Sequence, residues 1–193
     1  ITNAVRDAGL KITDVDGVFT AGQHSPALLG EALGITPRYV DGTSVGGCSF
    51  MILVEHAVAA LHHHLCDVAV VSHGESGRSG VGVTRSRDTS ISGQYEIPYG
   101  FGAAPTYFGL ITTRHMHEYG TTLEQWAQVA VSTRAWAMLH PKAMFRDPLT
   151  IEEVLNSRPI CYPFNILNIC LVTDAGGAVV LTRADRAQDC AKK

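Results

Sequence analysis

The succession of elements between residues 38 and 76 constrains the fold of this chain more than any other feature. Residues 38–40 have the pattern of a short strand. Residues 45–64 have the pattern of a long apolar helix whose glycines and alanines suit close packing against a sheet. The run CDVAVVSHG at 66–74 is nearly continuous in apolar residues, which is typical of a parallel strand covered by helices on both faces. The segment therefore predicts a layered, mostly parallel α/β architecture.

The residues before this segment continue the alternation. Residues 1–9 have the periodicity of an amphipathic helix, and residues 15–20 follow as a strand. Ser25 and Pro26 form an N-cap followed by proline at the first helical position, and Gly34 suits the end of that helix. The alternation of helix and strand thus extends over the first third of the chain.

A long excursion from about residue 75 to residue 150 interrupts this pattern. Its first part, 75–102, is rich in Gly, Ser and Arg, and loops of this length inside a compact domain are usually functional. Helices are expected over 106–119 and 122–139. Two capping boxes, each a threonine followed three residues later by a glutamate, predict helix starts: Thr121 with Glu124, and Thr150 with Glu153.

Two apolar strands, 169–173 and 177–182, are expected near the end of the chain. A length of 193 residues suits one α/β domain, so we expect residues 1–193 to form a single domain with the excursion inside it.

Composition excludes several classes of function. The chain has 15 Lys and Arg against 18 Asp and Glu, and a net charge of -3 does not favour nucleic-acid binding. The apolar runs are far shorter than the roughly 20 residues that cross a bilayer, and the first residues lack the pattern of a secretory signal. These patterns predict a cytoplasmic protein without a membrane span.

The five cysteines and the clustered histidines do not predict a metal site. The cysteines are odd in number and lack CxxC spacing, so we expect reduced thiols. His62, His63 and His64 are adjacent on the expected helix and point in different directions, which suits a helix carboxyl end better than a metal. Trp126 and Trp136 are expected in a core or an interface rather than in a lipid pocket.

The turn after the 38–40 strand places a hydroxyl, that of Ser44, before the long helix. The stretch YVDGTSVGGCSF and the following strand ending in HGES resemble the thiolase segment in which an Asn-x-x-Cys-x-x-Gly turn leads into a buried helix. Matching turn to turn puts Asp41 at the asparagine, Ser44 at the nucleophilic cysteine, Gly47 at the glycine and Glu75 at the acid after the strand.

Downstream segments extend the resemblance over nearly the whole chain. STRAWAMLHPKAMFRDPLT and SRPICYPFNILNICLVTDAGGAVVLTRADRA are similar to thiolase segments, and TDAG at 173–176 matches the family's Ser-Asp-Gly-Ala-Ala-like turn. The chain resembles above all the thiolases related to sterol carrier or lipid-transfer proteins, and the thiolase-like aldolases of steroid side-chain degradation. The resemblance implies the N-terminal half of the layered α/β/α/β/α thiolase core. The C-terminal half, with its catalytic histidine and second cysteine, is not present in this chain.

By the same resemblance, the substrate is an acyl-CoA thioester, with coenzyme A as part of the substrate and no bound cofactor. A homodimer is expected, and the steroid aldolases imply a small OB-fold partner protein. Arg78, Arg85 and Arg87 in the glycine-rich stretch are candidates to contact the CoA phosphates, because arginine matches phosphate geometry. The alternative is a solvated loop.

A serine at the cysteine position changes the expected chemistry. A helix amino end favours an adjacent anion by roughly 0.3–2 kcal/mol, enough to make a useful thiolate from a thiol whose pKa is about 8.5. The pKa of a serine hydroxyl is several units higher, so the hydroxyl stays protonated in the same field, and Ser44 needs a general base. His73 is the candidate base, since it follows the neighbouring strand and should lie at the same end of the sheet.

Three functions remain open. Retro-aldol cleavage of a β-hydroxyacyl-CoA needs a base and donors to the thioester enolate but no covalent acyl-enzyme, and therefore tolerates the serine. Claisen-type acyl transfer through Ser44 or Cys48 is the second, although Cys48 is expected deep in a buried helix. A non-catalytic subunit or lipid carrier is the third.

Overall fold

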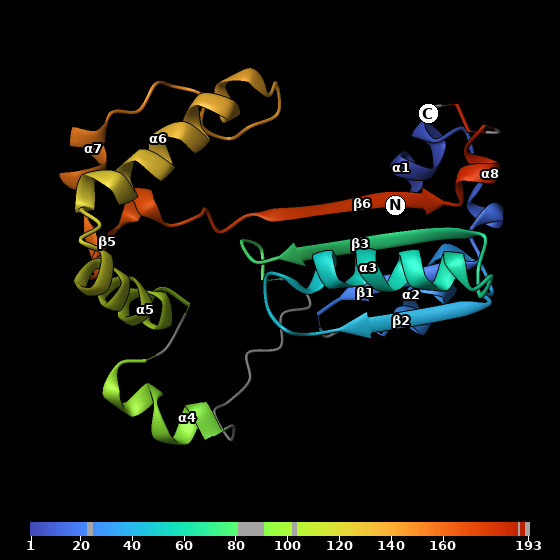
Figure 1. Cartoon of the computed structure of the whole chain (residues 1–193), viewed down its shortest axis with the longest axis horizontal. Coiled ribbons are helices and arrows are strands. Elements are labelled where there is room, and N and C mark those ends of the chain that lie inside the picture. Colours follow the sequence, from blue (N-terminus) through green and yellow to red (C-terminus); the bar gives the residue numbers. More distant parts are fainter. Residues whose placement is uncertain (23–24, 81–90, 102–103, 189, 192–193) are drawn as a thin grey trace. The chain divides into compact units, whose positions relative to one another are not determined.

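A computed structural model describes residues 1–22, 25–80, 91–101, 104–188 and 190–191 of the chain. The chain divides into two compact units (Figure 1). The first is formed by Ile1–Val83 together with Thr173–Lys193, and the second by Thr84–Val172. Each unit has its own helices and strands.

The first unit is built on a four-stranded sheet in the order β2-β1-β3-β6. Its strands are β1 Gly17–Ala21, β2 Tyr39–Thr43, β3 Val68–Ser76 and β6 Asp174–Thr182. β1 pairs in parallel with both β2 and β3, whereas β6 pairs antiparallel with β3 along all nine residues. The predicted α/β fold is confirmed, with one antiparallel strand added at the edge of a parallel sheet.

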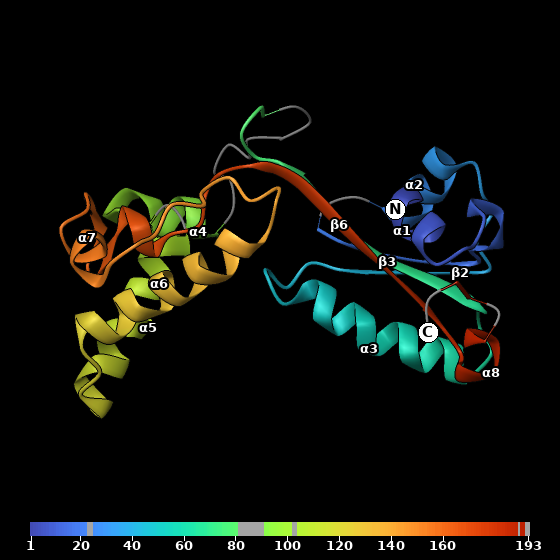
Figure 2. The same cartoon turned by 90° about the horizontal axis from the view of Figure 1, so that it is seen from above.

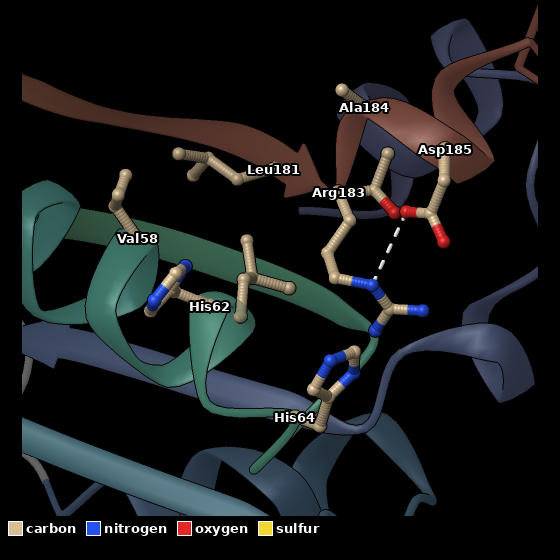
Figure 3. A pocket seen from close by; sticks show the side chains of 9 residues that line it. Val58, His62, His64, Leu181, Arg183, Ala184 and Asp185 are labelled. Atoms are coloured by element: carbon tan, nitrogen blue, oxygen red, sulfur yellow. Dashed lines mark hydrogen bonds and ion pairs between the residues drawn. The ribbon is translucent and has the colours of Figure 1, made fainter.

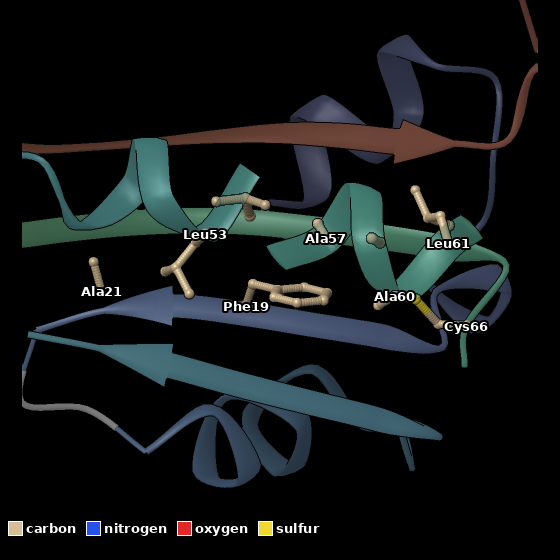
Figure 4. Packing of buried hydrophobic residues seen from close by; sticks show 9 residues of the cluster. Phe19, Ala21, Leu53, Ala57, Ala60, Leu61 and Cys66 are labelled. Atoms are coloured by element: carbon tan, nitrogen blue, oxygen red, sulfur yellow. The ribbon is translucent and has the colours of Figure 1, made fainter. Parts of the chain in front are cut away.

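Helices cover both faces of this sheet (Figure 2). The helical elements of the unit are α1 Thr2–Asp7, η1 Ile12–Asp14, α2 Pro26–Leu33, α3 Ser49–His62 and α8 Ala184–Ala187. Successive side chains of a strand point to opposite faces, so Phe19 packs with α3 and Val18 packs with the layer of α1. On the α3 side, Phe19 and Leu53 are fully buried at the centre of the core (Figure 4).

The long helix is shorter than its sequence pattern predicts. α3 begins at Ser49 rather than at residue 45, and the prediction was wrong at that end because Gly46 takes a left-handed φ of +81° that a helix does not contain. Gly46 and Gly47 therefore lie in the turn before the helix instead of packing on the sheet. Ala57 and Ala60 of the same helix are buried as expected.

The strand expected over 169–173 is not formed. Every residue of β3 from Val68 to Ser76 already pairs with a residue of β6, and β6 begins at Asp174. The apolar residues before it belong to the second unit, where Ile169 and Leu171 line a groove beside a helix. Their apolar character reflects that packing rather than strand pairing.

The second unit is mainly helical in its described residues. Its elements are α4 Ile91–Tyr95, η2 Ile97–Tyr99, α5 Ala104–Tyr119, α6 Leu123–Leu139, α7 Ile151–Leu155, the two-stranded pair β4 Pro159–Cys161 and β5 Phe164–Asn165, and η3 Ile166–Asn168. Gly109 allows α5 to approach the turn after β4 closely, since a Cβ there would lie 2.8 Å from the carbonyl oxygen of Tyr162. Asn165 closes the end of α7, donating from Nδ2 to the carbonyl oxygen of Leu155 at 2.7 Å.

One of the two predicted capping boxes is confirmed. The Thr150 hydroxyl accepts from the backbone N–H of Glu153 at the start of α7. The box expected at Thr121 was wrong by one residue, because Thr122 caps α6 and pairs with Gln125. The Thr121 hydroxyl instead lies 3.0 Å from Nδ1 of His115. Within the described residues, no helix is both long enough and apolar enough to cross a bilayer.

Candidate functional site

The carboxyl ends of the parallel strands meet at one edge of the first unit's sheet. The backbone N–H of Gly22, directly after β1, donates to the carbonyl oxygen of Thr43 at the end of β2, at 3.1 Å. On the other side of β1, Nδ1 of His73 lies 3.4 Å from the carbonyl oxygen of Ala21. Ser44 follows Thr43 directly, so this edge holds both residues expected in the site.

Ser44 lies in an exposed turn, and Ser49 organises that turn. The Ser49 hydroxyl accepts from the backbone N–H of Val45 at 2.9 Å and donates to the carbonyl oxygen of Gly46 at 2.7 Å. Ser49 is 2% exposed, so these bonds are shielded from water. Buried Ser49 thus holds the turn, a role that the sequence alone did not indicate.

Cys48, and not Ser44, occupies the amino end of α3. Cys48 is the N-cap residue and is exposed, whereas the sequence places it deep in a buried helix. That expectation was wrong because the helix begins four residues later than its apolar pattern indicates. Ser44 precedes this N-cap by four residues, and the next residue, Val45, is hydrogen-bonded to Ser49 at the first position of α3.

His73 and Ser44 lie on opposite sides of β1. Neighbouring strands are about 4.8 Å apart, which places β2 and β3 roughly 10 Å from each other across β1. A general base must come within about 2.6–3.2 Å of the atom that it deprotonates. His73 lies inside β3 rather than after it, with Nε2 at 3.4 Å from a carboxylate oxygen of Glu75. The imidazole of His73 thus reaches from β3 to the end of β1, the strand that separates it from Ser44.

A carboxylate–imidazole pair links β2 to α3. One carboxylate oxygen of Asp41 lies 2.6 Å from Nδ1 of His56, and the other accepts from the backbone N–H of Gly42 at 2.7 Å. A carboxylate on Nδ1 fixes the orientation of an imidazole and leaves Nε2 directed elsewhere. Sequence patterns do not indicate this pair, because the two residues lie fifteen positions apart on different elements.

Asp174 anchors the turn that follows β3. One of its carboxylate oxygens accepts from the backbone N–H groups of Arg78 and Ser79, at 2.9 and 3.0 Å. The bond from Ser79 is the largest cause of the lowered pKa of Asp174. The backbone of Arg78 is therefore fixed while its residue stays exposed. Arg85 and Arg87, the other candidate phosphate contacts, lie outside the described residues.

A pocket of about 510 Å³ lies at the opposite edge of the sheet (Figure 3). It is lined by the last turn of α3, including His62, and by the end of β6, including Leu181. Arg183 beside it is engaged by Asp185 and by Asp67, and this contact lowers the pKa of the Asp67 carboxyl. Within the described residues, no group of three His, Cys, Asp or Glu side chains converges as metal ligands would.

The chain is similar to several known proteins, and the match covers about half the length of each of them. The chain is 33% identical to the 17-hydroxy-3-oxo-4-pregnene-20-carboxyl-CoA lyase of Mycobacterium tuberculosis, with 98% of the chain and 52% of the relative covered. It is also 33% identical to the steroid side-chain-cleaving aldolase of Thermomonospora curvata, covering 96% of the chain and 51% of the relative. An acetyl-CoA acetyltransferase of Methanothermobacter thermautotrophicus is 28% identical, with 96% and 51% covered. No protein-family model matches the chain.

The chain likewise matches half or less of the length of similar solved structures. An Ltp2–ChsH2(DUF35) aldolase superposes with a TM-score of 0.86 at 30% identity, covering 98% of this chain and 50% of that one. A monomeric SCP2-thiolase-like protein from Mycobacterium smegmatis superposes with a TM-score of 0.74 at 19% identity, covering 98% and 42%, and supports the fold alone. The chain therefore spans about half the length of the relatives that it matches.

Proposed function

This chain is thiolase-like along its length and matches one half of such proteins, and on that premise we propose that the protein carrying it cleaves a carbon–carbon bond of a β-hydroxyacyl-CoA by a retro-aldol reaction. The observation that carries the proposal is the turn at residues 44–48. By the resemblance to thiolases, an alcohol, that of Ser44, stands at the position of the nucleophilic cysteine, and it lies in an exposed turn between β2 and α3. The two relatives at 33% identity are named as a lyase and an aldolase.

The proposed reaction needs no acyl-enzyme. A base takes the proton of the β-hydroxyl group, the bond between the α and β carbons breaks, and its electron pair passes into the thioester as an enolate. The former hydroxyl carbon leaves as a ketone or an aldehyde, and protonation of the enolate gives a shorter acyl-CoA. Donors aimed at the thioester oxygen stabilise the developing charge. We assign the base to the part of the protein outside this chain.

The names of the relatives support a steroid side chain as the acyl group. Coenzyme A is then part of the substrate, and we propose no separate cofactor. Arg78 is the described arginine best placed to contact CoA phosphates, because Asp174 fixes its backbone at the end of β3. A homodimer and a small OB-fold partner complete the proposal, and the solved aldolase similar to this chain is named for two components, Ltp2 and ChsH2(DUF35).

The test begins with the mass of the natural protein that contains this chain. That protein, with any partner that copurifies, is then incubated with a β-hydroxyacyl-CoA that carries a steroid ring system. We expect release of a ring ketone together with a shorter acyl-CoA. If thioester hydrolysis is the only reaction seen, or if no product forms with or without the partner, retro-aldol cleavage is excluded.

Acyl transfer through Cys48 is the second candidate, favoured by one observation. Cys48 is an exposed thiol at the N-cap of α3, so a substrate can reach its sulfur. One relative is an acetyl-CoA acetyltransferase. An acyl adduct found by intact-mass measurement, and lost in Cys48→Ala but kept in Ser44→Ala, would establish this alternative in place of the first.

A further inference from the structure

The turn at residues 44–48 is exposed, yet a buried side chain sets its conformation. Ser49 is 2% exposed, and its hydroxyl both accepts from the backbone N–H of Val45 and donates to the carbonyl oxygen of Gly46. The backbone N–H of Ser49 donates to the same Gly46 oxygen at 3.0 Å. These hydrogen bonds connect two residues of the turn to the first residue of α3.

The elements on either side of the turn are fixed by other contacts. Every residue of β2 pairs with a residue of β1. Helix α3 packs on the sheet through Leu53 and Ala57, both at 0% exposure, and the Asp41–His56 pair also ties it to β2. Removal of the Ser49 hydroxyl should therefore loosen the turn without displacing the strand or the helix.

At Gly46 and Gly47 the turn presents backbone rather than side chains to its surroundings. A Cβ added at either glycine would meet no described atom within 4 Å apart from those of neighbouring residues. The turn also follows the carboxyl end of β2, and open α/β sheets bind their ligands outside the carboxyl ends of their strands. A substrate bound at this edge of the sheet would therefore meet the peptide groups of the turn.

We propose that Ser49 is a positioning residue for the retro-aldol reaction, because its hydroxyl holds the turn in the conformation whose backbone contacts the thioester end of the acyl-CoA. The inference rests on the proposed function and names a residue of this chain on which the rate depends. A displacement of about 1 Å in a group that positions a substrate can lower the rate about 100-fold. Contact through the backbone does not require a reactive side chain at residue 44.

Two serine variants with matched hydrogen bonds test the role of Ser49. The Ser157 hydroxyl in the second unit also donates to one backbone carbonyl, that of Val154 at 2.7 Å, and accepts from one backbone N–H, that of Leu167 at 3.4 Å. Steady-state kinetics with the β-hydroxyacyl-CoA and urea unfolding are measured for Ser49→Ala and Ser157→Ala of the natural protein that contains this chain. We expect both variants to lower the urea midpoint. Ser49→Ala alone should lower kcat, by about 10- to 100-fold, and keep KM within about 3-fold.

Two glycine variants test the same turn without a change at Ser49. Gly46 has a φ of +81°, and Gly34 at the end of α2 has a φ of +70° with the same open space around it. Gly46→Ala and Gly34→Ala therefore introduce similar backbone strain at two places. Gly46→Ala should lower kcat at least about 10-fold, and Gly34→Ala should leave it within about 2-fold of the unmodified protein. This pair keeps the test decisive if Ser49→Ala does not fold.

Hydrogen exchange measures the turn itself, since the amide of Val45 should exchange faster in Ser49→Ala than in the unmodified protein. An unchanged kcat in Ser49→Ala and Gly46→Ala would overturn the inference and leave the retro-aldol function in place. An equal loss of kcat in Ser49→Ala and Ser157→Ala would do the same, because it would follow stability alone. Absence of cleavage by the unmodified protein would exclude the function and this inference together.

Discussion

The two units of this chain differ in how they use their apolar side chains. The sheet unit buries large ones completely, with Phe19 and Leu53 at 0% exposure between the sheet and α3. In the described part of the helical unit, the fully buried apolar side chains are the smaller Ala127 and Val154. Large apolar side chains of that unit are instead exposed, among them Leu139 at 75%.

This difference indicates separate roles. A sheet with a packed layer on each face carries its own stability, because buried apolar surface is the main driving force of folding. Contiguous exposed apolar surface usually serves contact with a ligand or a protein. The sheet unit is therefore the scaffold that presents the turn at Ser44, and we expect the helical unit to supply contact surface through its exposed apolar side chains.

Matched leucine substitutions give the largest expected effect. Leu53→Ala leaves a cavity in the core of the sheet unit and should lower the free energy of unfolding by about 3 kcal/mol. Leu139→Ala removes an exposed side chain and should change it by less than about 0.5 kcal/mol. Urea unfolding of the two variants measures both. A similar loss in the two variants would break the distinction between the units.

The reactivity of cysteines should also differ between the two units. Burial, followed by the nearby Asp16 and Asp67 carboxylates, raises the pKa of the Cys66 thiol in the sheet unit to about 11. Cys170 in the helical unit is exposed. At pH 8 the Cys66 thiol is therefore protonated and shielded, and Cys170 should react with iodoacetamide at least about 100-fold faster. Peptide mass mapping over time measures the two rates, and comparable rates would show that the sheet unit opens readily.

Helix caps test how far local interactions hold the helical unit. Thr122→Ala removes the N-cap of α6 and should cost about 1 kcal/mol, because the N–H of Gln125 loses its acceptor. Thr121→Ala leaves that cap intact and serves as the control. Both are measured by thermal or urea unfolding. A larger loss of stability in Thr121→Ala than in Thr122→Ala would show that Thr121 is the N-cap, as expected from the sequence.

The acid sensitivity of the sheet unit gives the smallest effect. Hydrogen bonding from Arg183 lowers the pKa of Asp67 below its ordinary value of 3.8. The carboxylate therefore stabilises the fold above about pH 4, and this contribution is lost as the pH falls through the folded-state pKa. The side chain is 33% exposed, so solvent limits the contribution to below about 1 kcal/mol. The difference in urea midpoint between the unmodified chain and Asp67→Asn should become smaller from pH 7 to pH 3. A difference that stays constant would contradict a stabilising role of the Asp67 carboxylate.

Sequence patterns predicted the sheet unit better than the site. Strand β3 and helix α2 form close to their expected positions. Both were predicted from residues adjacent in the sequence, the apolar run of β3 and the Ser25–Pro26 start of α2. The helix start at Ser49 was missed because an apolar pattern continues through the turn, where the left-handed Gly46 decides the geometry. Two features of the site depend on contacts between distant elements, which a single sequence does not reveal. They are the Asp41–His56 pair and the hydrogen bond from the backbone N–H of Arg78 to Asp174.

The most direct test of the central claim is the effect of Ser44→Ala on the natural protein that contains this chain. Steady-state kinetics with the β-hydroxyacyl-CoA substrate and intact-mass measurement during turnover are made on the same preparation. We predict that Ser44→Ala cleaves the substrate with kcat/KM within about 10-fold of the unmodified protein and that neither protein forms an acyl adduct. A loss of about 1,000-fold or more, together with an acyl adduct that disappears in the variant, would contradict it by showing Ser44 to be a nucleophile.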